Sequence, residues 1–412
     1  MDAREQRGMQ IAATTKLRKT KDAWIVPSQS GMGSYRVTEA PRIVSAGFMG
    51  GLECSCPDFD LRGLPCKHVF AVEIVAKRET VGGDVVTETL RVTYTQDWTA
   101  YNKAQTEEKE RFLPMLADLC STVPNPPQGR GRPRMPMSDM AFACVNRVYE
   151  GLSARRFDTD VREAHARGLT EADPHFNTVL RYLRSPEMTP VLTNLVVLSA
   201  LPLKAVEVDF AVDSTGFTTS RFERWFDHKW GKERSRHEWV KLHAMCGVRT
   251  NIVTAVEMSG GHANDTRFFR PLMATTTENF PIREVSADKA YASRANLQAV
   301  EDAGGMPYLP PRGCPVRQGP APQLPANADV WIRMYHLFAY NRDTFLSRYH
   351  QRSNVETTFS MIKRKFGDSV RSKSPEGQMN EVLAKVVAHN LCVLIASIHE
   401  LGLDSPRFSL AV

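Results

Sequence analysis

Three carboxylates in the second half of the chain have the side chains and the settings that metal-dependent chemistry needs. Asp213 and Asp288 each end an apolar run, and Glu356 lies in a segment with a helical pattern. Carboxylates on separate elements bind Mg²⁺, and a pair of such ions activates an attacking oxygen and stabilises a leaving one. We therefore predict that these acids are catalytic and hold two Mg²⁺ ions, with Mn²⁺ as an alternative. Each acid alone would be an ordinary turn or surface residue, so the prediction depends on all three.

Basic and aromatic residues surround the last acid and indicate that the reacting phosphates belong to DNA. On a helix that begins near Arg352, Glu356 and Lys363 fall on the same face as Arg352. An apolar stripe beside this face can pack on a sheet, which leaves the polar face at the sheet's edge near the other acids. The residues of this region predicted to contact DNA phosphates are Tyr349, Arg352, Lys363, Arg364 and Lys365.

The elements that must position these residues follow from the hydrophobic pattern. Residues 206–213 alternate as a strand, and the Ser-Thr-Gly at 214–216 predicts a turn that leaves Asp213 at the strand's end. Helices are predicted at 294–303 and from about Arg352. The five predicted strands are 206–213, 239–248, 252–258, 282–288 and 306–310. This order predicts an α/β fold with a ribonuclease H-like mixed five-stranded sheet flanked by helices.

A cluster of three cysteines and a histidine lies near the other end of the chain. One residue separates Cys54 from Cys56, and one separates Cys66 from His68. Three thiolates and an imidazole suit a tetrahedral, structural Zn²⁺ that leaves no open position for catalysis. The alternative is that the cysteines are simply buried and the histidine is there by chance, because free cysteine is often a core residue.

Composition places the chain among globular proteins. It has 412 residues, of which 42% are hydrophobic and 24% charged, and its net charge of +7 is a modest indication of a polyanionic partner. The sequence shows no run near 18 apolar residues and no signal-peptide core at its start, so we expect no membrane segment. The eight cysteines do not form an extracellular disulfide pattern, which favours an intracellular protein with reduced thiols.

Four regions differ in composition. We predict a small zinc-binding α+β domain at 1–95, a basic Pro/Gly-rich linker at 96–137, a helical region at 138–203 that could bind DNA, and the catalytic domain at 204–400. The linker contains a Gly-Arg-Pro core that resembles an AT-hook, whose arginines enter the minor groove. Arg130 and Arg132 are therefore predicted DNA contacts, with a plain linker as the equal alternative.

The pattern around the cysteines resembles a SWIM zinc finger over roughly residues 20–80. Cys-Pro-Asp-Phe follows the first ligand pair and Leu-Pro-Cys-Lys-His carries the second. The resemblance implies a recognition module that binds DNA or protein.

The region 204–400 resembles the DDE transposases of bacterial insertion sequences, in the group with a Tyr-Arg-Glu-Lys signature. Tyr349, Arg352, Glu356 and Lys363 match the signature's three gaps of two, three and six residues. Asp213 in Asp-Ser-Thr-Gly and Asp288 in Asp-Lys-Ala-Tyr match the first two acids, although the family commonly has Gly where this chain has Ala290.

The resemblance implies a transposase that cuts double-stranded DNA at its element's ends and joins it to target DNA. It also implies a homodimer on paired ends, at the nucleoid in a prokaryotic cytoplasm. Two alternatives stay open: a domesticated or inactive DNA-binding protein, and a ribonuclease H-fold nuclease without strand transfer.

Overall fold

The computed structural model divides the chain into two compact units, Met1–Tyr94 and Thr95–Val412, which are described separately. It describes residues 3–15, 17–20, 22–28, 34–39, 52–62, 65–81, 97–131, 133–219, 239–261, 263–314, 317, 321–325 and 327–410.

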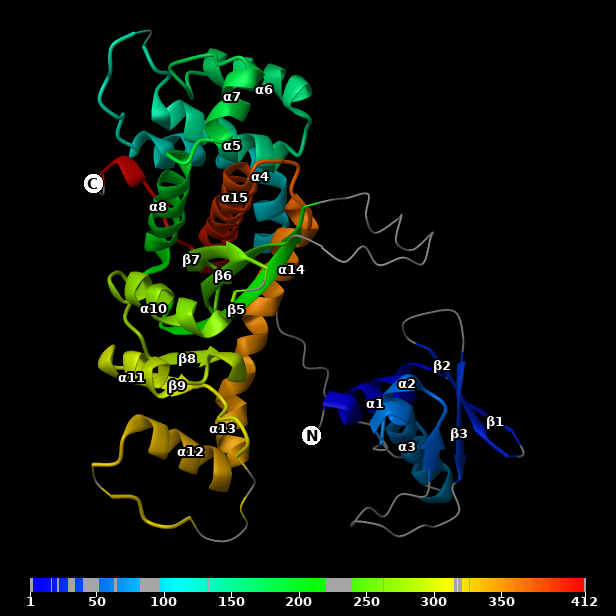
Figure 1. The fold of residues 1–412 in the computed structure, drawn as a ribbon. Coiled ribbons are helices and arrows are strands. Elements are labelled where there is room, and N and C mark those ends of the chain that lie inside the picture. Colours follow the sequence, from blue (N-terminus) through cyan, green and yellow to red (C-terminus); the bar gives the residue numbers. More distant parts are fainter. Residues whose placement is uncertain are drawn as a thin grey trace. The chain divides into compact units, whose positions relative to one another are not determined.

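The first unit is a small sheet with helices (Figure 1). Its described strands form an antiparallel sheet in the order β1-β2-β3-β4, and α1 packs against α3. Helix α3 carries His68 in its first turn. The elements are α1 (Ala3–Thr14), β1 (Arg18–Lys19), β2 (Trp24–Pro27), β3 (Ser34–Glu39), β4 (Leu52–Cys54), α2 (Pro57–Arg62) and α3 (Lys67–Val81).

The second unit begins with a helical part built around one long helix, α15 (Pro375–Leu401). In Figure 1, α4, α5 and α8 surround α15, and all three contact it. The helices that precede the sheet are α4 (Trp98–Ser121), α5 (Met137–Glu150), α6 (Ala154–Ala166), α7 (Phe176–Leu183) and α8 (Met188–Ala200), the last followed by the 3₁₀ turn η1 (Leu201–Leu203).

One sequence prediction needs correction in this part. The linker predicted for 96–137 contains α4, whose N-cap Asp97 accepts hydrogen bonds from Thr99 N and Ala100 N at 3.0 Å each. Within the predicted linker, the irregular part that the structure describes is the stretch between the end of α4 and the start of α5. In addition, α15 is long and apolar enough to cross a membrane, with a mean hydropathy of 1.7, although 78% of that apolar window is buried inside the protein. Its apolar surface is used for packing on α4, α5 and α8.

The sheet of the second unit is the predicted mixed five-stranded sheet. Its order is β7-β6-β5-β8-β9, with antiparallel pairs β5–β6 and β6–β7 and parallel pairs β5–β8 and β8–β9. This is the ribonuclease H-like order. The strands are β5 (Asp209–Thr218), β6 (Trp239–Gly247), β7 (Val253–Gly260), β8 (Glu284–Ala287) and β9 (Met306–Tyr308).

The turn predicted at 214–216 is wrong, because β5 continues through it to Thr218. Strand β6 pairs along the whole length, from Phe210 opposite Gly247 to Thr218 opposite Trp239, and these ladder hydrogen bonds keep the chain extended. The parallel partner β8 is shorter and ends with Ala287 opposite Val212. Asp213 therefore lies just beyond the end of that parallel pair, although it is in the middle of its own strand.

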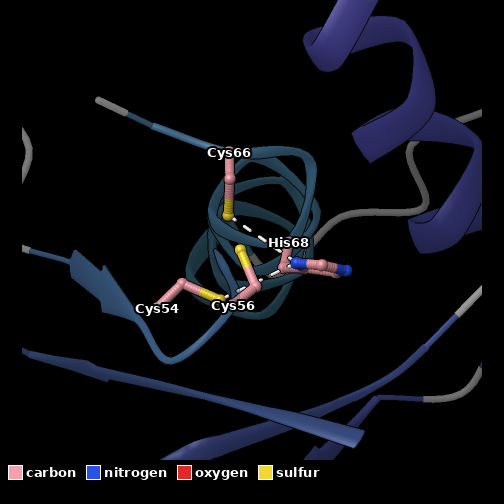
Figure 2. A group of neighbouring side chains, drawn as sticks. All are labelled: Cys54, Cys56, Cys66 and His68. Atoms are coloured by element: carbon pink, nitrogen blue, oxygen red, sulfur yellow. Dashed lines mark hydrogen bonds between the residues drawn. The ribbon is translucent and has the colours of Figure 1, made fainter. Parts of the chain in front are cut away.

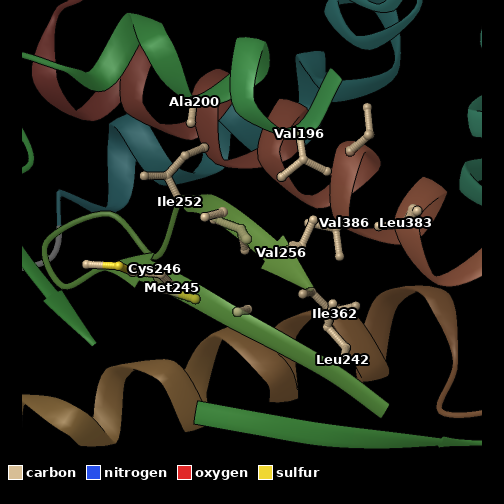
Figure 3. Close-up of a cluster of buried hydrophobic side chains, with 14 of the residues drawn as sticks. Val196, Ala200, Leu242, Met245, Cys246, Ile252, Val256, Ile362, Leu383 and Val386 are labelled. Carbon is tan, nitrogen blue, oxygen red and sulfur yellow. The ribbon is translucent and has the colours of Figure 1, made fainter. Parts of the chain in front are cut away.

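Helices α8, α14 and α15 pack on the sheet. Figure 3 shows Val196 of α8 and Val386 of α15 near the strands, and Ile362 of α14 beside Leu242 of β6. Helix α8 contacts β7, whereas α14 contacts β5 and β6. The elements around the sheet are η2 (Asp265–Phe268), α10 (Phe269–Thr277), η3 (Lys289–Tyr291), α11 (Arg294–Asp302), α12 (Val330–Tyr340), α13 (Arg342–Tyr349), η4 (His350–Arg352), α14 (Ser353–Phe366) and, near the end of the chain, η5 (Phe408–Leu410).

A buried carboxylate closes the β6–β7 turn. Glu207 is 1% exposed and accepts hydrogen bonds from Thr250 N at 2.6 Å, Thr250 Oγ1 at 2.7 Å and Arg249 N at 3.2 Å. Its side chain passes directly over Gly247, where an added Cβ would lie 2.3 Å from Glu207 Cδ. Because the three hydrogen bonds hold Glu207 in place, the side chain cannot move aside cheaply.

Gly247→Ala is therefore expected to destabilise the second unit by about 1–3 kcal/mol, the usual cost of overpacking a core. Denaturant unfolding followed by circular dichroism measures the change. Gly260→Ala is the matched control, because it lies on the neighbouring strand with no atom within 4 Å of its added Cβ. Equal stability of the two variants would contradict the prediction.

Candidate active site and metal centre

Asp213 and Glu356 are brought together by Arg352. The Arg352 guanidinium donates to Asp213 Oδ2 at 2.8 Å through Nη1 and to Glu356 Oε1 at 2.6 Å through Nη2. Asp213 belongs to β5, Arg352 ends η4, and Glu356 lies in the first turn of α14. The contact between α14 and β5 therefore joins two acids that are 143 positions apart in the sequence (356 − 213).

Asp288 lies immediately after β8, the strand parallel to β5. It caps η3, and its Oδ1 accepts a hydrogen bond from Lys289 N at 2.6 Å. A cavity of about 410 Å³ opens beside it, lined by Asp288, Lys289, Ala290, Pro311, Arg312 and Gly313. Arg312 fixes this loop by donating to Lys289 O and Ala290 O at 3.2 Å each. The second acid thus faces open space with a basic residue at its rim.

The pKa of Asp213 is shifted because the side chain is half-buried next to two other carboxylates. Burial raises the pKa of Asp213 above its usual value, and the carboxylates of Asp288 and Glu356 raise it further. The Ser214 amide, which donates to Asp213 Oδ1 at 2.8 Å, and the Arg352 guanidinium act in the opposite direction. Asp288 and Glu356 are therefore both close enough to influence Asp213, and the Arg352 guanidinium supplies counter-charge.

The acids do not converge on a single point. Within the described part of the chain, the group of possible metal ligands whose donor atoms all lie within 4.8 Å of one another is the Cys/His cluster, and it includes none of these carboxylates. A spread set of carboxylates agrees with two ions, which lie about 3.5–4 Å apart in two-metal sites and have different ligands. The donor set, three carboxylates with oxygen ligands only, fits hard divalent cations such as Mg²⁺.

The three cysteines and the histidine do converge (Figure 2). Cys54 ends β4, Cys56 precedes α2, and Cys66 and His68 lie at the start of α3. His68 Nδ1 lies 3.7 Å from Cys54 Sγ and 3.7 Å from Cys66 Sγ. A tetrahedral Zn²⁺ with bonds of about 2.3 Å to sulfur and 2.0 Å to nitrogen requires edges of roughly 3.5–3.8 Å between its ligand atoms.

The chemistry of the cluster also fits a metal. All four side chains are buried, and the three cysteines belong to the core of the first unit with residues such as Val26 and Val37. A hydrogen bond with the Cys54 thiol holds the pKa of the Cys66 thiol far below its usual range, so one thiolate is favoured before any metal binds. The fit of ligands, burial and spacing supports a structural zinc.

Comparison with known proteins finds a family match for each of the two regions that contain these residues. Residues 204–391 match the family model of the transposase DDE domain, and residues 48–77 match the SWIM zinc finger. Over residues 204–391 the chain is therefore similar to transposase DDE domains. The chain is also 24% identical over 216 residues to a probable transposase for insertion sequence element ISA1214 of Archaeoglobus fulgidus. This match covers 52% of the chain and 62% of the relative's length.

The predicted DNA-contacting residues of the DDE domain have different surroundings. Tyr349 is partly buried, with its ring 5.9 Å from the Arg352 guanidinium carbon, so both lie beside Asp213. Lys363 Nζ lies 5.4 Å from the ring of Phe217 on β5. Arg364 is exposed, whereas Lys365 forms an ion pair with Glu108 of α4. A phosphate would have to displace Glu108 in order to reach Lys365.

The two linker arginines are the remaining predicted contacts. Arg130 is exposed between α4 and α5, and Arg132 lies outside the described residues. Their role in binding DNA stays a prediction.

The structure adds a polar network beside Asp213 that the sequence analysis missed. Ser214 Oγ donates to Asp265 Oδ2 at 3.3 Å, and Lys241 forms an ion pair with the same Asp265 carboxylate. His243 Nδ1 lies 3.7 Å from Asp265 Oδ1, and burial lowers the pKa of His243 to about 4, which keeps the ring neutral near pH 7. Ser214 and His243 are opposite each other in the β5–β6 register, which only the paired sheet reveals.

Proposed function

We propose that the protein is a DNA transposase that cuts at the ends of an insertion sequence and joins them to target DNA by two-metal phosphoryl transfer. The observation that carries the proposal is the Arg352 bridge, which holds Asp213 of β5 and Glu356 of α14 together in a transposase DDE domain. The similarity to the probable transposase from Archaeoglobus fulgidus supports it. The domain match alone would not identify the acting residues.

Asp213, Asp288 and Glu356 would hold two Mg²⁺ ions, with Mn²⁺ as an alternative. When bound, such ions lower the pKa of an attacking water or 3′-OH and stabilise the departing oxygen. Asp213 is half-buried on a strand that pairs with β6 on one side and β8 on the other, which fixes the position of its backbone. Arg352, with its planar fork of donors, is suited to hold a phosphate once the carboxylates turn to the metals.

The DNA partner follows from the same assignment. Double-stranded DNA of the element ends and of the target would lie along the polar face of α14, held by Tyr349, Lys363 and Arg364. The SWIM zinc finger would contribute recognition of DNA or of protein. A homodimer that pairs two element ends, acting on nucleoid DNA in a prokaryotic cytoplasm, completes the proposal.

Arg352→Met is expected to change metal binding and DNA cleavage in opposite directions. Removing the guanidinium takes one positive charge from the acids and releases their oxygens, so Mn²⁺ is expected to bind the DNA-free protein up to about tenfold more tightly. DNA cleavage is expected to fall by about tenfold or more, because the phosphate loses its bidentate donor. Calorimetric titration with Mn²⁺ and a cleavage assay measure the two effects.

Arg348→Met is the control for Arg352→Met, because Arg348 is a half-exposed arginine of α13 whose Nη1 lies 3.4 Å from Glu284 Oε1. It is expected to change neither measurement by more than about twofold. A simultaneous loss of Mn²⁺ affinity and cleavage in Arg352→Met would show that the guanidinium organises the site instead of competing with the metal.

The test of the proposed function compares wild-type protein with Glu356→Ala on DNA that carries the element ends, in the presence of Mg²⁺ or Mn²⁺. Wild type is expected to cut the ends and produce joined products, and the variant is expected to bind the DNA without cutting it. Equal cutting by both proteins would remove Glu356 as a catalytic residue. Binding without cutting by both would favour an inactive DNA-binding protein, and cutting without joining would favour a nuclease.

A further inference from the structure

A small basic cavity lies where the helical part meets the DDE domain, away from the three acids. Its volume is about 30 Å³, and it is lined by Arg147 and Val148 of α5, Gly151, Leu152, Phe366 of α14, Ser369, Arg371, and Glu381 and Lys385 of α15. Gly151 and Arg371 are exposed, so the cavity has an open side. The function proposed above does not use this cavity.

The cavity contains positive charge that its surroundings do not balance. Arg147 is only 8% exposed, and its Nε has no hydrogen-bond partner among the described residues. Burial lowers the pKa of Arg147, and Arg371 and Arg184 repel its charge, whereas Glu381 is the nearby carboxylate that attracts it. A buried guanidinium in this setting is costly unless an anion accompanies it.

Both carboxylate oxygens of Glu381 already accept hydrogen bonds from other residues of the protein. One of its oxygens accepts from Arg371 N at 2.8 Å, and the other accepts from Ser372 N at 2.9 Å and Ser372 Oγ at 2.8 Å. Lys385, which is 2% exposed, donates to Gly367 O and Ser369 O at 2.8 Å each. These bonds shape the loop after α14 into a wall of the cavity, and Arg147 is left as the buried cation that faces its interior.

We propose that this cavity binds one phosphate of the DNA backbone. A cavity needs a volume of about 10–15 Å³ to hold one water-sized atom. The volume of about 30 Å³ in this cavity is therefore enough for about two oxygen atoms. A phosphodiester has two non-bridging oxygens, and these can enter while the two ester oxygens stay at the open side. The donors are Arg147 within the cavity and Arg371 at its mouth.

The position of the cavity fits one DNA strand that also reaches the acids. Phe366 is ten residues after Glu356 on α14, which places the cavity roughly 15 Å along the helix axis from the last acid. With about 3.4 Å of duplex axis per phosphate of one strand, this distance corresponds to roughly four base steps. The inference rests on the proposed function for the source of the phosphate, because it assumes that DNA lies along α14.

The test uses full-length Arg147→Met, which keeps most of the side-chain volume and removes the charge. Compared with wild type, its affinity for element-end DNA is expected to fall about tenfold, and the slope of log K against log salt concentration is expected to become shallower by about 0.9. Arg371→Met, at the exposed mouth, is expected to show a smaller change in the same direction. Arg294→Met, an exposed arginine of α11 that pairs with Asp329, is expected to keep the wild-type slope.

A second measurement is independent of DNA. Inorganic phosphate is expected to raise the melting temperature of wild type and not that of Arg147→Met, which without phosphate is expected to melt at or above the wild-type temperature. If wild type bound no DNA yet showed this phosphate effect, the proposed function would fail and the cavity would be a site for free phosphate. If Arg147→Met kept the wild-type salt slope and the wild-type response to phosphate, the proposal would be overturned.

Discussion

Asp213→Asn is expected to reduce Mg²⁺-dependent DNA cleavage by on the order of 10³-fold or more while leaving DNA binding near the wild-type level. The magnitude is that of removing one member of a catalytic group that acts as a unit. Asp213 is the acid whose replacement is expected to be most severe, because its side chain is 20% exposed on a strand held by β6 and β8, whereas that of Glu356 is 57% exposed.

Asp209→Asn is the matched control for this experiment. Asp209 belongs to the same strand and, four residues earlier, to the same face, but as the first residue of β5 it forms an ion pair with Arg283. Its replacement is expected to change cleavage by less than about threefold. Cleavage rates at saturating DNA and binding by filter retention measure both variants. Retention of more than a tenth of the cleavage rate by Asp213→Asn would show that Asp213 is not a metal ligand.

Removing the metal from the cysteine cluster is expected to unfold the first unit and leave the second folded. The described core of the first unit is small, and Cys54, Cys56 and Cys66 belong to it together with apolar residues of the sheet and of α3. Small domains of this kind depend on a metal, and binding of structural zinc contributes about 10 kcal/mol or more to folding. Treatment with a chelator is therefore expected to abolish one of two thermal transitions.

Cys66→Ser is expected to reproduce the effect of the chelator and to lower the zinc content, which atomic emission measures. Cys144→Ser is the matched control, because Cys144 is equally buried but lies on α5 in the second unit. It is expected to keep the full zinc content while lowering the other transition. Cys66→Ser protein that kept its zinc and both transitions would contradict the assignment.

The chemistry-bearing residues were open to prediction because their signals are local. The Tyr349 to Lys363 spacing lies within one segment, the two ligand pairs of the cluster are short motifs, and Asp288 directly follows an apolar run. The strand order could also be predicted, since each strand has its own alternating pattern. The extension of β5 to Thr218 could not, because Ser-Thr-Gly favours a turn by itself and only pairing with β6 keeps it extended.

Helix α4 was missed for a related reason. The Pro/Gly-rich basic stretch after it dominates the composition of 96–137. The apolar face of α4 is buried because the helix packs against α15, which is distant in the sequence. The network of Ser214, Lys241, His243 and Asp265 was missed because strand register and the placement of η2 bring it together.

The sequence by itself determined which side chains could hold metals and in what order the strands and helices follow. Only the tertiary structure decided that Arg352 bridges Asp213 and Glu356, that Lys365 pairs with Glu108, and that Arg147 is buried with no hydrogen-bond partner for its Nε among the described residues. The physical reason is the separation in sequence over which each kind of signal acts. Helical and strand periodicity and short ligand spacings are properties of adjacent residues, whereas the partner of a long charged side chain depends on elements that packing brings together from distant parts of the chain.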